Sequence, residues 1–139
     1  MDKQTDIFTK GTIPTLNDPL LANLETYWKT LRHAQQIPAR AALDPSQIDH
    51  ALASTFILQR VAPGTARFRV AGQRLHDLIK MDARGMPFTT LFQPAARDQI
   101  KSLTEAVFSG PEIIGLPLVS HGSVLRPTVH GAMLLLPMQ

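Results

Sequence analysis

Five histidines are the residues in this sequence best suited to metal or acid–base chemistry. They are His33, His50, His76, His121 and His130. No two of them stand at the i, i+4 spacing that places two imidazoles on one metal ion. His76 and Asp77 are adjacent, but neighbours on a helix point about 100° apart and do not form a catalytic dyad. We therefore interpret the histidines as surface or hydrogen-bonded residues and expect no metal site.

Other signatures of catalysis are missing from the sequence. It contains no cysteine, which excludes disulfides, thiolate metal sites, cysteine nucleophiles and flavin–cysteinyl photochemistry. It also lacks a phosphate loop, a dinucleotide-binding glycine pattern, a His-Glu-x-x-His motif and a nucleophile elbow. A triad assembled from distant Ser, His and Asp residues stays open. We name no catalytic residue and expect no enzyme.

The length and composition fit one globular domain. The chain has 139 residues, of which 44% are hydrophobic and 18% are charged, and these are ordinary values for a folded protein. Lys and Arg number 14 and Asp and Glu number 11, a net charge of +3 that is spread along the chain. Because nucleic-acid binding needs basic residues gathered on one face, we expect no nucleic-acid partner.

Residues 1–16 are predicted to form a flexible leader. They mix polar residues with Gly11 and Pro14 and show no periodicity. The stretch resembles neither a signal peptide nor a transmembrane helix. We therefore expect a cytoplasmic protein without membrane contact, whose ordered part is a single domain over residues 17–139.

Two helices are predicted within residues 17–54. Asp18 and Pro19 form a helix start, and an apolar stripe at helical spacing continues to about His33. This stripe packs either on its own domain or on a partner, and four of its residues are our contact candidates. They are Leu24, Tyr27, Trp28 and Leu31.

The second helix is expected to begin at Asp44. Pro45 follows, and Gln47 stands at the capping-box position. The buried face of this helix is expected to consist of Ile48, Leu52 and Phe56.

Residues 55–139 are predicted to form the core of the domain. A hairpin of Thr55 to Val61 and Arg67 to Ala71 would place Phe68 and Val70 on one face. A short helix through Leu75, Leu78 and Ile79 follows, then an apolar segment with Phe88 and Phe92, and then a longer helix opened by Pro94. The last predicted strands are Ile113 to Ser120, Val124 to Leu125 and Val129 to Leu136. Because βαβ units are absent, we expect an α+β domain with a central antiparallel sheet, flanked by short helices and preceded by the N-terminal helices.

Several short motifs resemble the PAS domain family, in particular a divergent subfamily of short proteins common in alphaproteobacteria. The motifs, in order, are Tyr27-Trp28, Leu31-Arg32, Pro38 with Arg40, Asp44-Pro45 and Arg67 to Gly72, followed by Arg84-Gly85, Phe88, Arg97 and Leu136-Pro137-Met138. The resemblance covers residues 20–139. It departs from the subfamily at His33 to Gln36, where a basic, glycine-bearing stretch is usual, and just after Pro137, where a PAS sheet adds a last strand. An unpaired sheet edge would favour a dimer or a partner contact.

The resemblance implies a sensory or regulatory module with a small pocket between sheet and helices. The pocket candidates are Phe68, Leu75, His76, Ile79, Phe88, Phe92, Leu103, Val107 and Met133. They form either a packed core without a ligand or the walls of a site for a small apolar molecule, oriented by His76, Thr128 or His130. No cofactor is required, although one histidine, His76 or His130, would suffice as the axial ligand of a haem.

Three functions remain open from the sequence. The first is a regulatory module that binds itself or a signalling partner. The second is a small α+β cone-type enzyme, which needs a hydrogen-bonded His–carboxylate pair buried in a cleft. The third is a nucleic-acid adaptor, which needs five arginines on one face. These are Arg32, Arg40, Arg60, Arg67 and Arg69.

Overall fold

The structure is a computed structural model that describes residues 18–32, 36–120 and 122–139. Its first helix, α2, spans Pro19–Thr30. The Asp18 side chain accepts a hydrogen bond from the Leu20 N–H at 2.9 Å, so the expected cap is present. The flexible leader expected over residues 1–16 lies outside the described residues.

The second predicted helix forms, but as a 3₁₀ helix. Elements η2 (Arg40–Ala42) and η3 (Pro45–Ser54) follow α2, and η3 is kinked at Ile48. Asp44 caps η3 by accepting from the Ser46 N–H. The expectation that Leu52 is buried was wrong, since Leu52 is 41% exposed and Ala51 is buried instead. A 3₁₀ helix repeats every three residues, so the buried face passes from Ile48 to Ala51.

The first hairpin consists of β1 (Phe56–Ala62) and β2 (Thr65–Ala71), which pair antiparallel. Phe68 points into the core, as expected, but Val70 is 42% exposed. The register shifts between Ile57 and Leu58, which leaves Arg69 as an extra residue on β2. Such a bulge interrupts the alternation of side chains, so Phe68 and Val70 no longer share a face.

The middle of the chain forms helices. These are α3 (Gln73–Ile79), the 3₁₀ turns η4 (Phe88–Leu91) and η5 (Pro94–Ala96), and α4 (Arg97–Ser109). The longer helix is present as expected, and it buries Ile100, Leu103 and Val107. In α3 only Leu75 is buried, whereas Leu78 is 66% exposed.

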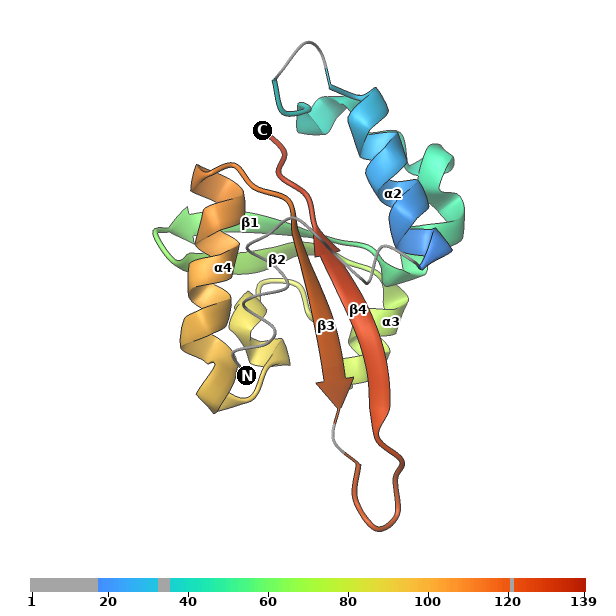
Figure 1. Cartoon of the computed structure of the whole chain (residues 1–139), viewed down its shortest axis with the longest axis vertical. Helices are drawn as coiled ribbons and strands as arrows, with labels where there is room; N and C mark the ends of the chain where they lie inside the picture. Colours follow the sequence, from blue (N-terminus) through green and yellow to red (C-terminus); the bar gives the residue numbers. More distant parts are fainter. Residues whose placement is uncertain (1–17, 33–35, 121) are drawn as a thin grey trace.

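The second hairpin consists of β3 (Ile114–Ser120) and β4 (Val129–Leu135). The strand expected at Val124 to Leu125 is absent, and these residues lie in the turn at the hairpin's tip, 103% and 93% exposed. The tip extends well beyond the rest of the domain (Figure 1). Strand residues are held by packing as well as pairing, and this tip has no surface to pack on.

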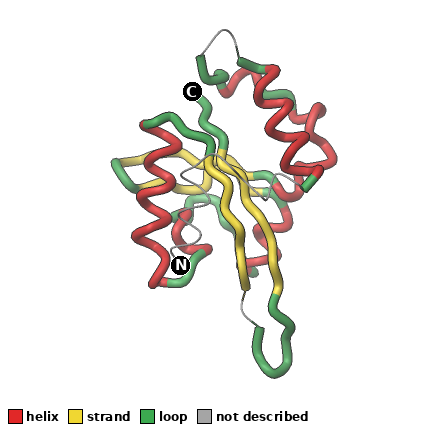
Figure 2. Tube along the Cα trace, viewed as in Figure 1, coloured by secondary structure: helices red, strands yellow, loops and turns green. Residues whose placement is uncertain are grey.

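The domain is therefore α+β, as expected. In the described residues, however, its strands form two separate antiparallel pairs instead of one central sheet. The β1–β2 hairpin crosses behind one end of the β3–β4 hairpin, with α4 on one side and α2 on the other (Figures 1 and 2). A cluster of aromatic rings lies within the core, in edge or tilted contacts at 5.3–5.8 Å between ring centroids. It comprises Phe56, Phe68, Phe88 and Phe92. Such contacts stabilise the core beyond the area that they bury.

The residues after β4 join the N-terminal helices to the core. The Trp28 indole N–H donates to the Pro137 carbonyl at 2.8 Å. The backbone N–H of Gln139 donates to the Pro38 carbonyl at 2.8 Å, and that of Arg40 donates to the Gln139 carbonyl at 3.1 Å. We call residues Pro137 to Gln139 the C-terminal tail. Its backbone–backbone hydrogen bonds are with Pro38 and Arg40, at the start of η2.

Gly72 lies against the backbone of η3, and this contact gives a first prediction. A Cβ at this position would collide with the carbonyls of Leu52 and Ala53, which cannot move aside. Gly72→Ala should lower the free energy of unfolding by about 1–3 kcal/mol through overpacking. Urea denaturation followed by circular dichroism measures it.

Gly131→Ala is the matched control, because a Cβ there meets no atom within 4 Å. It should change stability by less than about 0.5 kcal/mol. Equal effects of the two variants would contradict the close approach of Gly72 to η3.

Trp28→Phe tests the bond to the C-terminal tail. Loss of the indole donor leaves the buried Pro137 carbonyl without that partner and should cost about 1–2 kcal/mol. The amides of α2 should exchange with deuterium faster, because that helix loses its attachment. Thr30→Ala is the control, because it removes only a hydrogen bond within the helix. If deuterium exchange in α2 became as fast in Thr30→Ala as in Trp28→Phe, the attachment of α2 by the Trp28 bond would be contradicted.

Candidate functional site

A large groove lies between α2 and the rest of the domain. Its volume is about 1210 Å³, and its walls come from α2, β1, α4, both C-terminal strands and the C-terminal tail. All four contact candidates and six of the nine pocket candidates line it. These are Leu24, Tyr27, Trp28, Leu31, Leu75, Ile79, Phe92, Leu103, Val107 and Met133. The structure thus brings together in one groove two sets of residues that the sequence placed in separate sites.

The other three pocket candidates do not line the groove. Phe68 and Phe88 are each 2% exposed and belong to the aromatic core. His76 lies on α3, away from the groove. Trp28 lines the groove but is itself 5% exposed and bonded to the C-terminal tail. Among the contact candidates, Trp28 therefore forms part of the groove wall and is not exposed for a partner to contact.

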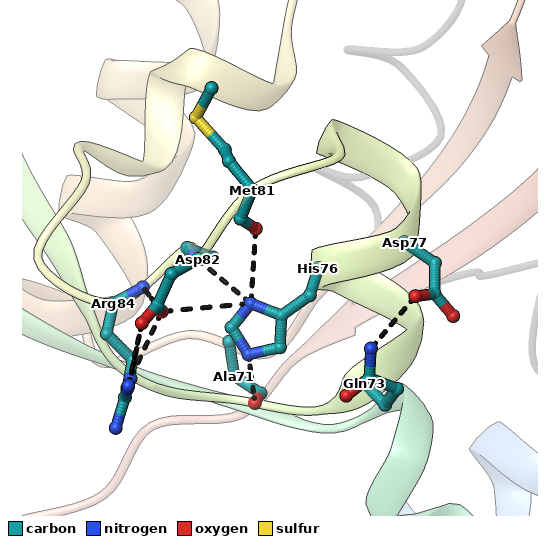
Figure 3. A network of polar contacts seen from close by, with 8 residues as sticks. Ala71, Gln73, His76, Asp77, Met81, Asp82 and Arg84 are labelled. Atoms are coloured by element: carbon teal, nitrogen blue, oxygen red, sulfur yellow. Dashed lines mark hydrogen bonds and ion pairs between the residues drawn. The ribbon is translucent and has the colours of Figure 1, made fainter.

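His76 is held by backbone groups on both sides of its ring (Figure 3). The Ala83 N–H reaches Nδ1 at 3.0 Å, so Nδ1 carries the lone pair. In the tautomer that fits this bond, Nε2 donates to the Ala71 carbonyl at 3.1 Å, while the Met81 carbonyl lies 3.3 Å from Nδ1. This arrangement ties the end of β2 to the loop after α3. Neither nitrogen is left to ligate a haem iron, so the structure does not support His76 as an axial ligand.

The carboxylates near His76 are engaged elsewhere. Asp82 lies 3.8 Å from Nδ1, but its oxygens take a bidentate bond from Arg84, which holds the pKa of Asp82 well below its usual range. Asp77 accepts from Gln73 and points away from the imidazole (Figure 3). The His–carboxylate pair in a cleft that an enzyme would need is therefore not formed by His76. Among the described residues no group of three potential metal ligands lies together.

One of the groove's arginines is neutralised by a carboxylate. Arg60 on β1 donates through Nε and a terminal nitrogen to Glu105 on α4, at 3.0 and 2.8 Å. Glu105 also accepts from the Gly64 N–H in the hairpin turn. These bonds lower the pKa of the Glu105 carboxyl and fasten the β1–β2 hairpin to α4. Arg60 therefore serves the fold.

The five arginines of the nucleic-acid hypothesis are not gathered in one place. Arg40, Arg60 and Arg69 line the groove, whereas Arg32 and Arg67 do not. Arg32 lies over the Trp28 ring, and Arg67 donates to the Gly85 carbonyl. Arg74, which was not among the five, also lines the groove, and its guanidinium donates to the Ser54 hydroxyl.

Sequence reasoning missed the contribution of the strands to the groove. Residues 56–60 of β1 and 116–120 of β3 line it without interruption. The apolar runs in both segments were visible in the sequence, but they were assigned to strands with no site attached. A smaller hollow of about 340 Å³ between η3 and β2 was also missed.

The sequence matches the PAS domain family over residues 16–139. The chain belongs to the PAS domain family. The resemblance seen in the sequence motifs is thereby confirmed at the level of the family, and the α+β architecture agrees with it. No curated protein and no solved structure matches the chain.

PAS domains are generally sensory and regulatory modules without enzymatic activity, and they commonly mediate protein–protein interaction. This PAS domain is consistent with such a role. In the part of the chain that the structure describes, no helix is both long enough and apolar enough to span a membrane.

The Arg60–Glu105 pair gives a prediction for the pH dependence of stability. Because the folded state lowers the pKa of Glu105, the pair stabilises the PAS domain above the ordinary Glu value of 4.5. That contribution is lost as the pH falls through the lowered pKa. A double-mutant cycle of Arg60→Met and Glu105→Gln, measured by urea unfolding, should therefore give a larger coupling at pH 7 than at pH 3.5.

Lys101→Met controls for the loss of a cation, since Lys101 is exposed on α4 and has no ion pair within the described residues. Its effect on stability should not follow the Glu105 titration. A coupling that stays constant between the two pH values would show that the Arg60–Glu105 bonds are absent in solution.

Proposed function

We propose that this PAS domain is a cytoplasmic regulatory module that binds a protein partner, which is a signalling protein or a second copy of the chain. The groove is the binding site. The observation that carries the proposal is the single concave surface shared by α2 and the domain core. A partner seated there would contact both parts at once.

The geometry supports a regulatory use of this contact. The core wall of the groove comes from β1, α4 and the C-terminal strands, and the opposite wall comes from α2. Few contacts besides the C-terminal tail and η3 hold α2 to the domain. An occupant would therefore shift the balance between two positions of α2 if it bound one of them more tightly. The output would pass through α2 to whatever protein the domain controls.

A small apolar ligand is the second candidate occupant. Pockets for such molecules typically have volumes of about 300–1,000 Å³, and the groove exceeds that range only slightly. Leu103, Val107 and Met133 supply apolar walls. His130, which is exposed and also lines the groove, would orient such a ligand.

An enzyme is the function that the site supports least. His76 lies outside the groove, and its ring nitrogens are used by the backbone. The chain would act on other proteins through its surface, as a regulatory module does.

Photo-crosslinking tests the proposal directly. A benzophenone amino acid replaces Leu24, a half-buried groove residue on α2, in cells that naturally express the protein. Illumination should give a crosslinked species larger than the chain, and mass spectrometry identifies it as a second copy or another protein. The same substitution at Val124, at the hairpin's exposed tip, should give no such species.

Native and denaturing mass spectrometry of the purified protein, together with an absorption spectrum, separates the two candidate occupants. A releasable small mass at wild type that is lost in a Leu103→Trp variant would establish the small ligand. A bare polypeptide mass combined with no crosslink at Leu24 would overturn the proposed function.

A further inference from the structure

The main chain of β1 forms part of the groove. Residues 56–60 all line it, yet successive side chains of a strand point to opposite faces. Side chains from both faces of β1, with the main chain between them, therefore line the groove. Within the described residues β1 pairs only with β2, so its other edge has no partner strand. Such an edge offers unpaired N–H and C=O groups to an extended chain.

The charges that line the groove are unbalanced. Arg40, Arg69 and Arg74 are exposed and line the groove, and none of them has an ion pair with a carboxylate in the described residues. Their side chains have only neutral partners: Arg69 donates to Gln59 and Arg74 to Ser54. The carboxylate side chain among the described lining residues is that of Asp18, which caps α2. The rim of the groove is thus basic and its floor is apolar.

We propose that the groove's occupant is an extended segment of a partner protein that carries acidic and apolar side chains in alternation and adds as a strand to the free edge of β1. This rests on the proposed function. One face of such a segment would contact half-buried apolar residues of the groove such as Leu58 and Leu118, while the other would place carboxylates near Arg40, Arg69 and Arg74. An unpaired basic rim favours this partner over a basic or neutral one by electrostatic complementarity.

A random nine-residue peptide library displayed on phage is the probe. It is selected against the full chain and against a triple variant, Arg40→Gln, Arg69→Gln and Arg74→Gln. The wild type should enrich peptides with Asp or Glu at alternating positions between apolar residues. The triple variant should lose the acidic enrichment. Arg126→Gln, at the exposed hairpin tip and outside the groove, should retain it.

One selected peptide is then synthesised with and without N-methyl groups on alternate backbone nitrogens. Fluorescence anisotropy should show that the unmethylated peptide binds the triple variant about tenfold more weakly than it binds the wild-type chain. Its affinity for the wild-type chain should fall as added salt screens the arginines of the rim. The peptide methylated on the nitrogens that face β1 should bind at least about tenfold more weakly than its unmethylated form, because each lost backbone hydrogen bond weakens binding.

The outcomes separate this inference from the proposed function. Selection of apolar peptides without acidic enrichment would overturn the charge assignment and leave the groove as a protein-binding site. Equal binding of the methylated and the unmethylated peptide would overturn strand addition. Failure to select any peptide, together with no crosslink at Leu24, would overturn both the inference and the proposed function.

Discussion

The hydrogen bond from the Trp28 indole to the Pro137 carbonyl supports the arrangement on which the site depends. It joins residues 109 positions apart in the chain and is buried. With it, the C-terminal tail lies between α2 and the core and pairs with the segment before η2. The other contacts that hold α2 include its packing on η3 and the bond from the Asp44 N–H to the Tyr27 hydroxyl. The groove exists because α2 lies at this position. The shape of the groove therefore depends on the Trp28 indole N–H and on the three residues of the C-terminal tail.

The core and the groove use their polar groups differently. His76 and the Arg60–Glu105 pair are engaged by groups of their own chain, and each ties two elements together. The histidine joins β2 to the loop after α3, and the ion pair joins β1 to α4. At the rim, by contrast, Arg69 and Arg74 have neutral partners and remain exposed to solvent. Polar groups that stabilise the fold already bond to a carboxylate or to the backbone. Polar groups without such a bond are able to bind a partner.

Local patterns in the sequence predicted where helices and strands lie more successfully than they predicted which side chains of those elements are buried. The caps at Asp18 and Asp44 and the longer helix that follows Pro94 all depend on neighbours a few residues away. The predicted burial of Leu52 was wrong because a 3₁₀ helix has three residues per turn instead of 3.6. The predicted face of Val70 was wrong because a bulge adds one residue to β2. The tip at Val124 and Leu125 was taken for a strand because apolar character alone does not say whether a packing surface is near.

By itself the sequence determined the α+β class, the positions of the main helices and hairpins, and membership of the PAS family. These follow from short-range spacing and from motifs whose order survives in the linear chain. Only the tertiary structure decided that the contact candidates of α2 and most of the pocket candidates line the same groove, and that Phe68, Phe88 and His76 lie elsewhere. The physical reason is that a groove is formed by the distance between elements. That distance was set here by the C-terminal tail and the Trp28 bond, neither of which leaves a periodic pattern in the sequence.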